Sequence, residues 1–252
     1  VIFQELLNPD AVVIRNDPEV RSLEGLAQEI RILSGKIPET VWIREGDIRY
    51  SVDLLKGQKT GAYLDQRENR LLQGSLLTGP GRVLDCFSYT GGFALHLAGK
   101  AESVTAIDDS AQALETGRRN AEKNGFNNIT FLKANVFDFL KREENASNKY
   151  DLIVLDPPPF ARKKSALSGA LRGYRELNLR ALRCLKPGGI LSTFSCSYNM
   201  SEARLGEVIS QAAQGIKKRV ILLEKRLQSG DHPILLNFPE SNYLKGMILR
   251  VT

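Results

Sequence analysis

Cysteine and histidine are scarce in this sequence of 252 residues. It contains three cysteines and two histidines, and no two cysteines are spaced as CxxC. A structural zinc site needs about four such ligands at close spacing, so we expect no metal site. Three isolated thiols do not form a disulfide framework either. We therefore expect reduced cysteines and a cytoplasmic protein.

Long apolar runs, targeting signals and the dinucleotide fingerprint are also missing. No stretch reaches the roughly 20 apolar residues of a membrane-spanning helix, and no signal peptide is visible. We therefore expect no membrane association. The pattern GxGxxG, which cradles a pyrophosphate, is absent. Its absence argues against a nucleotide-dependent oxidoreductase.

The composition that remains is that of a globular protein. Hydrophobic residues make up 42 % of the chain and charged residues 25 %. The 35 basic and 29 acidic residues give a net charge of +6, which is compatible with an anionic partner such as RNA. The sequence starts with Val1 instead of Met. We therefore expect a fragment or a shortened member of a longer protein family.

Residues 1–60 mix short strand-like and helix-like patterns. β-branched residues predict strands over 11–15 and 40–44, and residues 45–47 predict a hairpin turn. Apolar residues at helical spacing predict a helix from Glu19 to Leu33. We interpret residues 1–60 as a small α+β domain on the RNA side of the protein, without chemistry of its own.

Residues 61–252 alternate regularly between strand and helix patterns. A glycine-bracketed loop at 57–61 leads into a helix that ends near Leu77, for which Asp65 is the expected N-cap. The predicted strands are 82–87, 103–107, 129–133, 150–155, 189–195, 220–226 and 245–252. The predicted helices are 92–99, 110–124, 136–144, 169–185 and 201–215. This rhythm predicts βαβ units and a doubly wound, mostly parallel sheet.

The first three strand-to-helix loops carry polar residues that suit a nucleoside. The first strand ends with Asp85 and Phe87 and runs into Tyr89, Thr90 and the glycine pair Gly91-Gly92, where a ligand can approach the backbone closely.

The second and third loops complete this set. Asp108, followed by Asp109 and Ser110, ends the second strand, where a carboxylate can accept both hydroxyls of a ribose. The alternative is that Asp108 caps the next helix, a role that Asp109 or Ser110 can fill instead. Asn135, followed by Val136, can offer its amide to an adenine edge. Together these loops favour a nucleoside cofactor without a diphosphate.

The buried strand 150–155 runs directly into Asp156-Pro157-Pro158-Pro159-Phe160. Each proline fixes φ and removes a backbone donor, so neither the sheet nor a helix continues here. Ligands of open α/β sheets bind beyond the carboxyl ends of the strands. The turn therefore either presents Asp156 to a planar substrate or is only a stiff exit from the strand.

This order of motifs resembles the class I S-adenosylmethionine-dependent methyltransferases. More narrowly, it resembles the bacterial large-subunit ribosomal RNA cytosine-C5 methyltransferases of the RlmI type. The matching segments cover nearly all of the chain from about residue 10 onward and are 57–61, 64–70, 86–94, 156–158, 169–174, 193–197, 231–233 and 243–246. Two departures are Asn135, where the family commonly has Asp, and Pro159. Family members usually begin with an RNA-binding PUA domain, which we do not find.

The resemblance implies a seven-stranded Rossmann-like sheet whose last strand is antiparallel, and methylation of 23S ribosomal RNA. It also implies S-adenosylmethionine as cofactor. The expected cofactor-binding residues are Gln66, Arg67, Asp85, Phe87, Tyr89, Thr90, Gly91, Gly92, Asp108, Asp109, Ser110, Asn135, Val136 and Asp156.

Cys196 follows the predicted strand 189–195, and we expect it to be the catalytic nucleophile together with Asp156. Carbon-5 of cytosine does not attack a methylsulfonium directly, whereas addition of a thiolate to carbon-6 turns the ring into a nucleophilic enamine. Asp156 would share a proton with ring N3. Cys86 and Cys184 fit small buried residues better. The base that removes the C5 proton stays open.

Basic residues after the Asp156 turn are candidates for phosphate contacts. Arg162, Lys163 and Lys164 belong to this group, as do Arg172 and Arg175. Arg180 and Arg183 are further candidates, but a solvated helix face explains Arg172, Arg175, Arg180 and Arg183 nearly as well. We therefore expect RNA contacts only in the region 162–175.

Two alternatives stay open besides an oxidoreductase. A methyltransferase for exocyclic amino groups of adenine or guanine also uses Asp-Pro-Pro but places an aromatic residue directly next to it, whereas Phe160 comes one residue later. A non-catalytic RNA-binding module would need no cofactor. The oligomeric state is undetermined, with a homodimer among the options.

Overall fold

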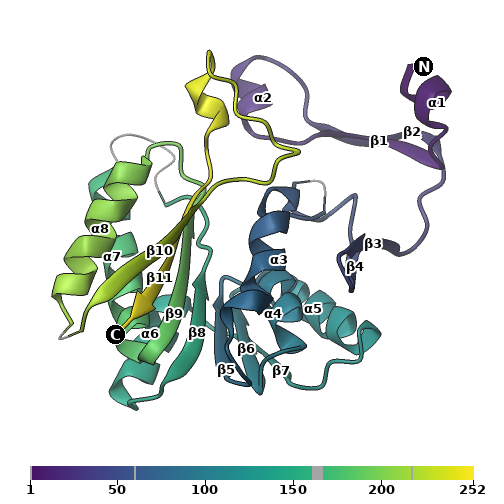
Figure 1. Cartoon of the computed structure of the whole chain (residues 1–252). Coiled ribbons are helices and arrows are strands. Elements are labelled where there is room, and N and C mark those ends of the chain that lie inside the picture. Colours follow the sequence, from purple (N-terminus) through teal and green to yellow (C-terminus); the bar gives the residue numbers. More distant parts are fainter. Residues whose placement is uncertain (1, 60, 161–166, 217) are drawn as a thin grey trace. The chain divides into compact units, whose positions relative to one another are not determined.

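The chain folds into two compact units, Val1–Leu64 and Asp65–Thr252. We describe them from a computed structural model that covers residues 2–59, 61–160, 167–216 and 218–252 (Figure 1). Within these ranges every helix is too short or too polar to cross a membrane. Each unit is described by itself.

The first unit consists of two small antiparallel sheets. Its elements are α1 (Ile2–Leu7), β1 (Ala11–Asn16), α2 (Val20–Leu23), β2 (Glu29–Gly35), β3 (Val41–Glu45) and β4 (Ile48–Val52). β1 pairs with β2, and β3 pairs with β4 through a tight turn at Gly46 and Asp47, as expected. Arg15 links β1 to the segment after β4, because its guanidinium donates to Leu54 O and Gly57 O at 3.0 Å each.

The prediction of a helix from Glu19 to Leu33 is wrong. Only Val20–Leu23 is helical, and Glu29–Gly35 forms β2. Gly25 has a φ of +70°, a left-handed conformation that does not continue a helix. Pairing of β2 with β1 satisfies the backbone of residues 29–35, so strand pairing prevails over an apolar spacing that fits a helix.

The second unit is built on a seven-stranded sheet with the order β10-β11-β9-β8-β5-β6-β7. β11 is antiparallel to both of its neighbours, and the pairs from β9 to β7 are parallel. The predicted fold class, including the antiparallel last strand, is therefore confirmed. The strands are β5 (Arg82–Cys86), β6 (Ser103–Asp108), β7 (Ile129–Lys133), β8 (Tyr150–Leu155), β9 (Leu185–Ser195), β10 (Val220–Arg226) and β11 (Lys245–Val251).

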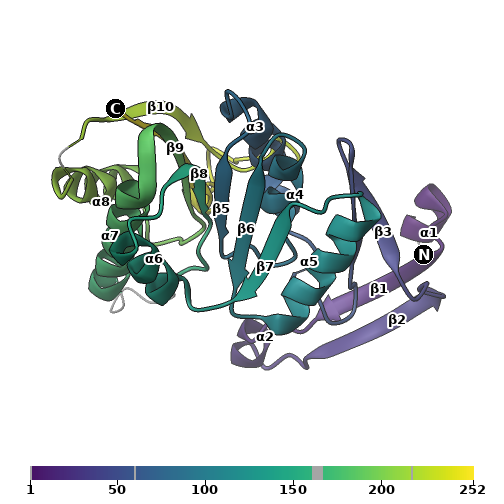
Figure 2. The same ribbon diagram turned by 90° about the horizontal axis from the view of Figure 1, so that it is seen from below.

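Helices cover both faces of this sheet (Figures 1 and 2). α6 (Val136–Asn145), α7 (Leu167–Cys184) and α8 (Glu202–Gln214) pack on one face and enclose the main apolar core. α3 (Arg67–Leu76), α4 (Gly92–Ala98) and α5 (Ala111–Lys123) cover the other face. The described residues also include the short 3-10 turns η1 (Leu64–Gln66) and η3 (Pro239–Ser241).

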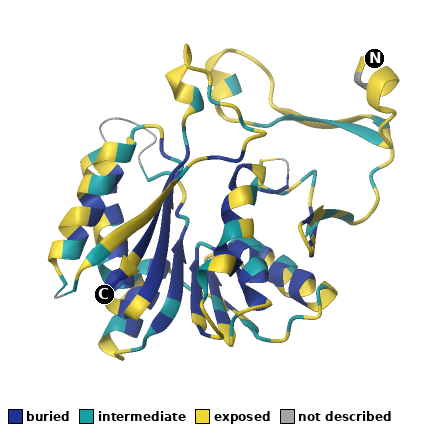
Figure 3. Cartoon of the chain, viewed as in Figure 1, coloured by how far each residue is buried: buried dark blue, intermediate teal, exposed yellow. Residues whose placement is uncertain are grey.

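β8 lies near the centre of the sheet and is buried on both faces (Figure 3). Leu152, Ile153 and Val154 have no exposed surface. A strand covered on both sides reads as a continuous apolar run, and this is why its bounds could be predicted from sequence. Because β5, β6, β7, β8 and β9 run in parallel, the residues that follow them all lie at one edge of the sheet.

Asp65 does not cap α3, contrary to expectation. Gln66 occupies the N-cap position, without a side-chain capping bond. Asp65 lies in η1 and is buried, and its carboxylate accepts a hydrogen bond from the Tyr243 hydroxyl at 3.0 Å. Local sequence predicts that the Asp65 side chain caps the helix. In the structure it bonds instead to Tyr243, which is 178 residues away in the chain.

We expect Gly246→Ala to destabilise the protein by about 1–3 kcal/mol through overpacking. A Cβ at this position in β11 would lie 2.5 Å from a ring atom of Phe194. That ring is fully buried and stacked on Phe93, so it has no room to retreat. Denaturant unfolding measures the effect. Gly79→Ala is the control, since its Cβ meets nothing within 4 Å, and equal stability of the two variants would contradict this account.

Candidate active site

The loop after β5 has an unusual backbone conformation. Phe87, Tyr89 and Gly91 all have positive φ values, of 63°, 51° and 82°. Such conformations are costly for residues other than glycine and are concentrated at functional sites. At Gly91 a side chain would also lie 2.9 Å from the Phe131 ring. Thr90 and Gly92, predicted in the same loop, are partly exposed.

Asp85 lies beneath this loop and is completely buried. Its Oδ2 accepts a hydrogen bond from the backbone N–H of Ala94 at 2.9 Å, in the first turn of α4. Its Oδ1 is buried without a partner among the described residues. The side chain therefore supports the loop and the start of α4 from below.

Asp108, at the end of β6, faces the same loop. Its Oδ2 accepts from the backbone N–H of Tyr89 at 2.8 Å, and its Oδ1 accepts from that of Ser110 at 2.9 Å. Ser110 caps α5 through Ala113 N, so Asp108 does not serve as the cap. Each carboxylate oxygen keeps a second lone pair, which suits a pair of hydroxyls. The neighbouring Asp109 is exposed.

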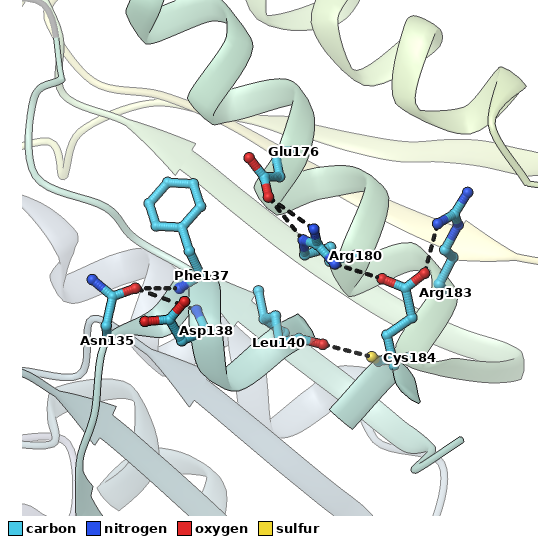
Figure 4. A network of polar contacts seen from close by, with 9 residues as sticks. Asn135, Phe137, Asp138, Leu140, Glu176, Arg180, Arg183 and Cys184 are labelled. Atoms are coloured by element: carbon cyan, nitrogen blue, oxygen red, sulfur yellow. Dashed lines mark hydrogen bonds and ion pairs between the residues drawn. The ribbon is translucent and has the colours of Figure 1, made fainter. Parts of the chain in front are cut away.

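Asn135, after β7, is the N-cap of α6 (Figure 4). Its Oδ1 accepts from Phe137 N at 3.0 Å and from Asp138 N at 3.3 Å. The cap fixes the orientation of the amide, so its NH₂ group is the part that can donate to an adenine ring nitrogen. The next residue, Val136, is buried.

Asp156, after β8, ends a chain of side-chain hydrogen bonds. Gln66 Nε2 donates to Asp156 Oδ1 at 3.0 Å, and Asn69 Nδ2 donates to Gln66 Oε1 at 2.6 Å. Arg226 Nε donates to Asn69 Oδ1 at 2.8 Å. A guanidinium can only donate, so it determines which way both amides point. Asp156 Oδ1 is therefore an acceptor.

Arg67, the other predicted residue of this segment, points elsewhere. Its guanidinium forms an ion pair with Asp231 at 3.2 Å and lies 3.6 Å from Glu68. Its described partners thus lie in the loop between β10 and β11 and in α3.

Three carboxylates converge at this edge of the sheet. Burial, and to a lesser extent the charges of Asp156 and Asp108, raise the pKa of Asp85 to about 8, although its hydrogen bond from Ala94 and the charge of Arg70 act in the opposite direction. Burial also raises the pKa of Asp108. A cluster of mutually repelling acids favours a positively charged ligand. Among the described residues, no group of His, Cys, Asp and Glu could hold a metal ion.

Cys196 directly follows β9 and is half-buried, whereas Cys86 and Cys184 are fully buried. None of the three forms a disulfide. The parallel register pairs Leu155 of β8 with Thr193 of β9, so Asp156 and Cys196 leave adjacent strands at the same edge. The charges of both groups act on the Tyr174 hydroxyl, which lies 2.9 Å from Ser195 Oγ.

Phe160 packs against three other aromatic rings. Its ring centroid lies 4.9 Å from that of Tyr174, 6.0 Å from Phe137 and 6.4 Å from Phe87. The following residues Arg162, Lys163 and Lys164 lie outside the described residues.

The arginines of α7 fall into two groups. Arg180 bonds to Glu176 and to Glu144 of α6, and Arg183 bonds to Glu144 at 2.6 Å (Figure 4). This pair therefore joins two helices. Arg172 and Arg175 are exposed in the first half of α7, the half nearer the edge where Asp156 lies.

The structure shows several further residues that contact or adjoin the candidate site and to which the sequence analysis assigned no role. Asn69 and Arg226 orient Gln66, Tyr174 lies beside Ser195, and Lys245 lies opposite Ser195 in the sheet. Asn69, Tyr174 and Lys245 fall within the segments that resemble the family, and this was the available signal. Arg226 falls outside them and left no signal.

The strand order, the antiparallel β11 and the polar loops at one edge together define a class I methyltransferase fold. The chain belongs to the family of S-adenosylmethionine-dependent methyltransferases, whose family model matches residues 26–217. S-adenosylmethionine is the cofactor of this family.

Curated relatives carry a more specific name. The chain is 44 % identical to ribosomal RNA large subunit methyltransferase I of Shewanella frigidimarina, over 96 % of this chain and 62 % of that protein. It is 43 % identical to the protein of the same name from Aeromonas salmonicida, over 94 % and 60 %. The chain thus spans about three fifths of the length of these relatives.

A solved structure is similar as well. The crystal structure of SMU.776 complexed with SAH superposes with a TM-score of 0.78 at 30 % identity, over 88 % of this chain and 59 % of that one.

We expect Asp85→Asn to flatten the pH dependence of stability. Because the pKa of Asp85 rises from 3.8 to about 8 on folding, the folded state binds more protons between these values. The contribution of Asp85 to wild-type stability should therefore be highest below about pH 4 and fall as the pH rises through 8. Asn keeps an acceptor for Ala94 N but does not ionise, so the difference in Tm should favour the variant increasingly from pH 5 to pH 8.

Thermal melts across this pH range measure the difference. Glu102→Gln, at an exposed position, is the control and should follow the wild-type profile. Parallel profiles for Asp85→Asn and wild type would show that Asp85 is not protonated on folding.

Proposed function

We propose that this protein transfers the methyl group of S-adenosylmethionine to carbon-5 of a cytosine in large-subunit ribosomal RNA, through a covalent adduct with Cys196. The observation that carries the proposal is a reduced, half-buried thiol at the end of β9, beside the Asp156 turn and at the edge that carries the cofactor loops. The names of the curated relatives support ribosomal RNA as the substrate.

The residues of the first three loops fit the cofactor. Asp108 has two carboxylate oxygens with lone pairs for the ribose hydroxyls, and the NH₂ group of Asn135 is oriented for the adenine. The left-handed loop 87–91 lets the ligand approach the backbone. S-adenosylmethionine supplies a methyl group on a positively charged sulfonium, and ionised Asp108 and Asp156 at this edge would favour that charge.

Cys196 and Asp156 would act on the cytosine ring from adjacent strands. The thiolate of Cys196 adds to carbon-6, which makes carbon-5 nucleophilic. Asp156 stabilises the charge that develops on the ring by sharing a proton with N3. Because Gln66 donates to Oδ1 of Asp156, this shared proton belongs on Oδ2. After methylation, the C5 proton leaves and the bond between sulfur and carbon-6 breaks.

The RNA has to present its base outside the helical stack to reach such a site. Arg172 and Arg175 would bind phosphates near this edge, and their exposure in the first half of α7 supports this assignment. Arg180 and Arg183 are less suitable, since Glu144 and Glu176 already neutralise them. We assign the first unit, Val1–Leu64, to the RNA side of the protein.

Methylation of an exocyclic amino group is the alternative function. Enzymes of that kind need an aromatic ring next to Asp-Pro-Pro to stack on the base. Phe160 instead packs among Phe87, Phe137 and Tyr174. The packing of this ring favours the cytosine reaction.

Incubation with S-adenosylmethionine and RNA that contains 5-fluorocytosine should yield a covalent protein–RNA adduct. Fluorine at carbon-5 cannot leave as a proton does, so the bond between sulfur and carbon-6 persists. The adduct, observed on a denaturing gel, should vanish in Cys196→Ala. Cys184→Ala is the matched control, because Cys184 is fully buried, and it should still form the adduct. Methylation of RNA by Cys196→Ala would support the amino-group alternative.

Asp108→Ala should weaken binding of S-adenosylhomocysteine at least about tenfold, because hydrogen bonds to a charged carboxylate contribute about 1.5–3 kcal/mol each. Titration calorimetry measures the affinity. Asp151→Ala is the control, since Asp151 pairs with Lys186 at the opposite edge of the sheet. Equal affinity of Asp108→Ala and wild type would remove Asp108 from the cofactor site.

A further inference from the structure

Tyr174 is a buried residue of α7 that contacts two turns at the candidate site. It is 1 % exposed. Its ring centroid lies 4.9 Å from that of Phe160, which belongs to the turn that begins at Asp156. Its hydroxyl lies 2.9 Å from Ser195 Oγ, and the residue after Ser195 is Cys196. One side chain thus joins the turns that carry the two catalytic candidates.

Ser195 connects Tyr174 to the backbone around Cys196. Ser195 Oγ accepts a hydrogen bond from the backbone N–H of Ser197 at 3.3 Å, so this bond spans Cys196. Both serines are buried. A hydroxyl has one donor and two acceptor sites, so Ser195 Oγ can bond to Ser197 N and to the Tyr174 hydroxyl at once. The backbone of Cys196 is therefore restrained by a bond whose oxygen also contacts Tyr174.

Phe160 connects Tyr174 to the Asp156 turn and to two further loops. Its ring centroid lies 6.0 Å from that of Phe137, at the start of α6, and 6.4 Å from that of Phe87, in the loop after β5. Aromatic pairs attract each other at these distances. The Asp156 turn therefore packs on a cluster of rings, and within this cluster Tyr174 is the residue that also bonds to Ser195.

Tyr174 acts on the site through geometry. Burial raises the pKa of its hydroxyl, so the phenol is neutral and adds no charge to the turns that it joins. Because only 1 % of the residue is exposed, a bound RNA cannot contact it to any useful extent. Its bond to Ser195 and its packing on Phe160 are the contacts through which it affects the reaction.

We propose that Tyr174 is a positioning residue that holds Cys196 and Asp156 at the spacing that a single cytosine ring requires. This rests on the proposed function, in which Cys196 adds to carbon-6 while Asp156 acts at N3. Both atoms belong to one rigid ring, so the thiol and the carboxyl group have to be aligned together. Loss of alignment slows such a reaction even when both groups are present. Tyr174 itself forms no bond to the substrate.

Tyr174→Phe tests this proposal, because it removes the hydroxyl and keeps the ring on Phe160. With saturating S-adenosylmethionine and RNA that contains 5-fluorocytosine, we expect the covalent adduct to form about tenfold more slowly than in wild type. The RNA concentration that gives half of the maximal rate should not change, since Tyr174 is buried. Alkylation of Cys196 by iodoacetamide, a small reagent that needs no alignment with Asp156, should keep its wild-type rate.

Tyr150→Phe is the matched control. Tyr150 is 2 % exposed, and its hydroxyl donates to Glu143 Oε2 at 2.6 Å. It begins β8, at the opposite edge of the sheet from Asp156. The control loses a buried hydrogen bond of the same kind, so it should lose stability and still form the adduct at the wild-type rate.

Ser195→Ala removes the same contact from the other side, and it serves if Tyr174→Phe does not fold. Because it also removes the bond to Ser197, it should slow adduct formation at least as much as Tyr174→Phe, and the double variant should be no slower than Ser195→Ala. Additive effects of the two changes would overturn the proposal.

Two further outcomes contradict the positioning role of Tyr174. One is a wild-type rate of adduct formation in Tyr174→Phe, and the other is alkylation of Cys196 that slows by the same factor as adduct formation. Failure of the cytosine reaction is a separate outcome, because it appears as the absence of an adduct in wild type and overturns the proposed function together with this inference.

Discussion

Parallel hydrogen bonding between β8 and its two neighbours determines where most of the candidate residues lie. β5 and β9 flank β8 in the same direction, so Phe87, Asp156 and Cys196 all follow strands that end at one edge. Pairing of β6 and β7 adds Asp108 and Asn135 to this edge. Residues that are up to about a hundred positions apart thus become neighbours, because the strand ends are aligned by the ladder and covered on both faces by helices.

A chain of hydrogen bonds behind the candidate residues fixes the orientation of the Asp156 side chain. Arg226 lies on β10 at the margin of the sheet, yet it determines the orientation of Asn69 and, through it, of Gln66. Gln66 in turn holds one oxygen of Asp156 as an acceptor. The carboxyl group of Asp156 is therefore held in one orientation by this chain of hydrogen bonds. Buried networks of this kind restrict a site to a single arrangement when every member is satisfied.

The electrostatics of the edge follow from the same layout. Ionised carboxylates at the ends of β6 and β8 favour a cationic cofactor, and their charges oppose ionisation of Asp85 on β5. A lysine on β11, the antiparallel neighbour of β9, lies on the opposite side from these acids.

The sequence alone determined the parallel sheet and the edge at which most of the candidate residues lie. The strands 129–133, 150–155 and 220–226 were predicted with the bounds that the structure shows, because a strand flanked by turn residues has a clear local signal. The loops after them could be compared with a family pattern for the same reason. Only the tertiary structure decided the pairing of residues 29–35 with β1, the partner of Asp65 and the burial of Lys245. Each of these depends on a contact between segments distant in the chain, and local propensity does not encode such contacts.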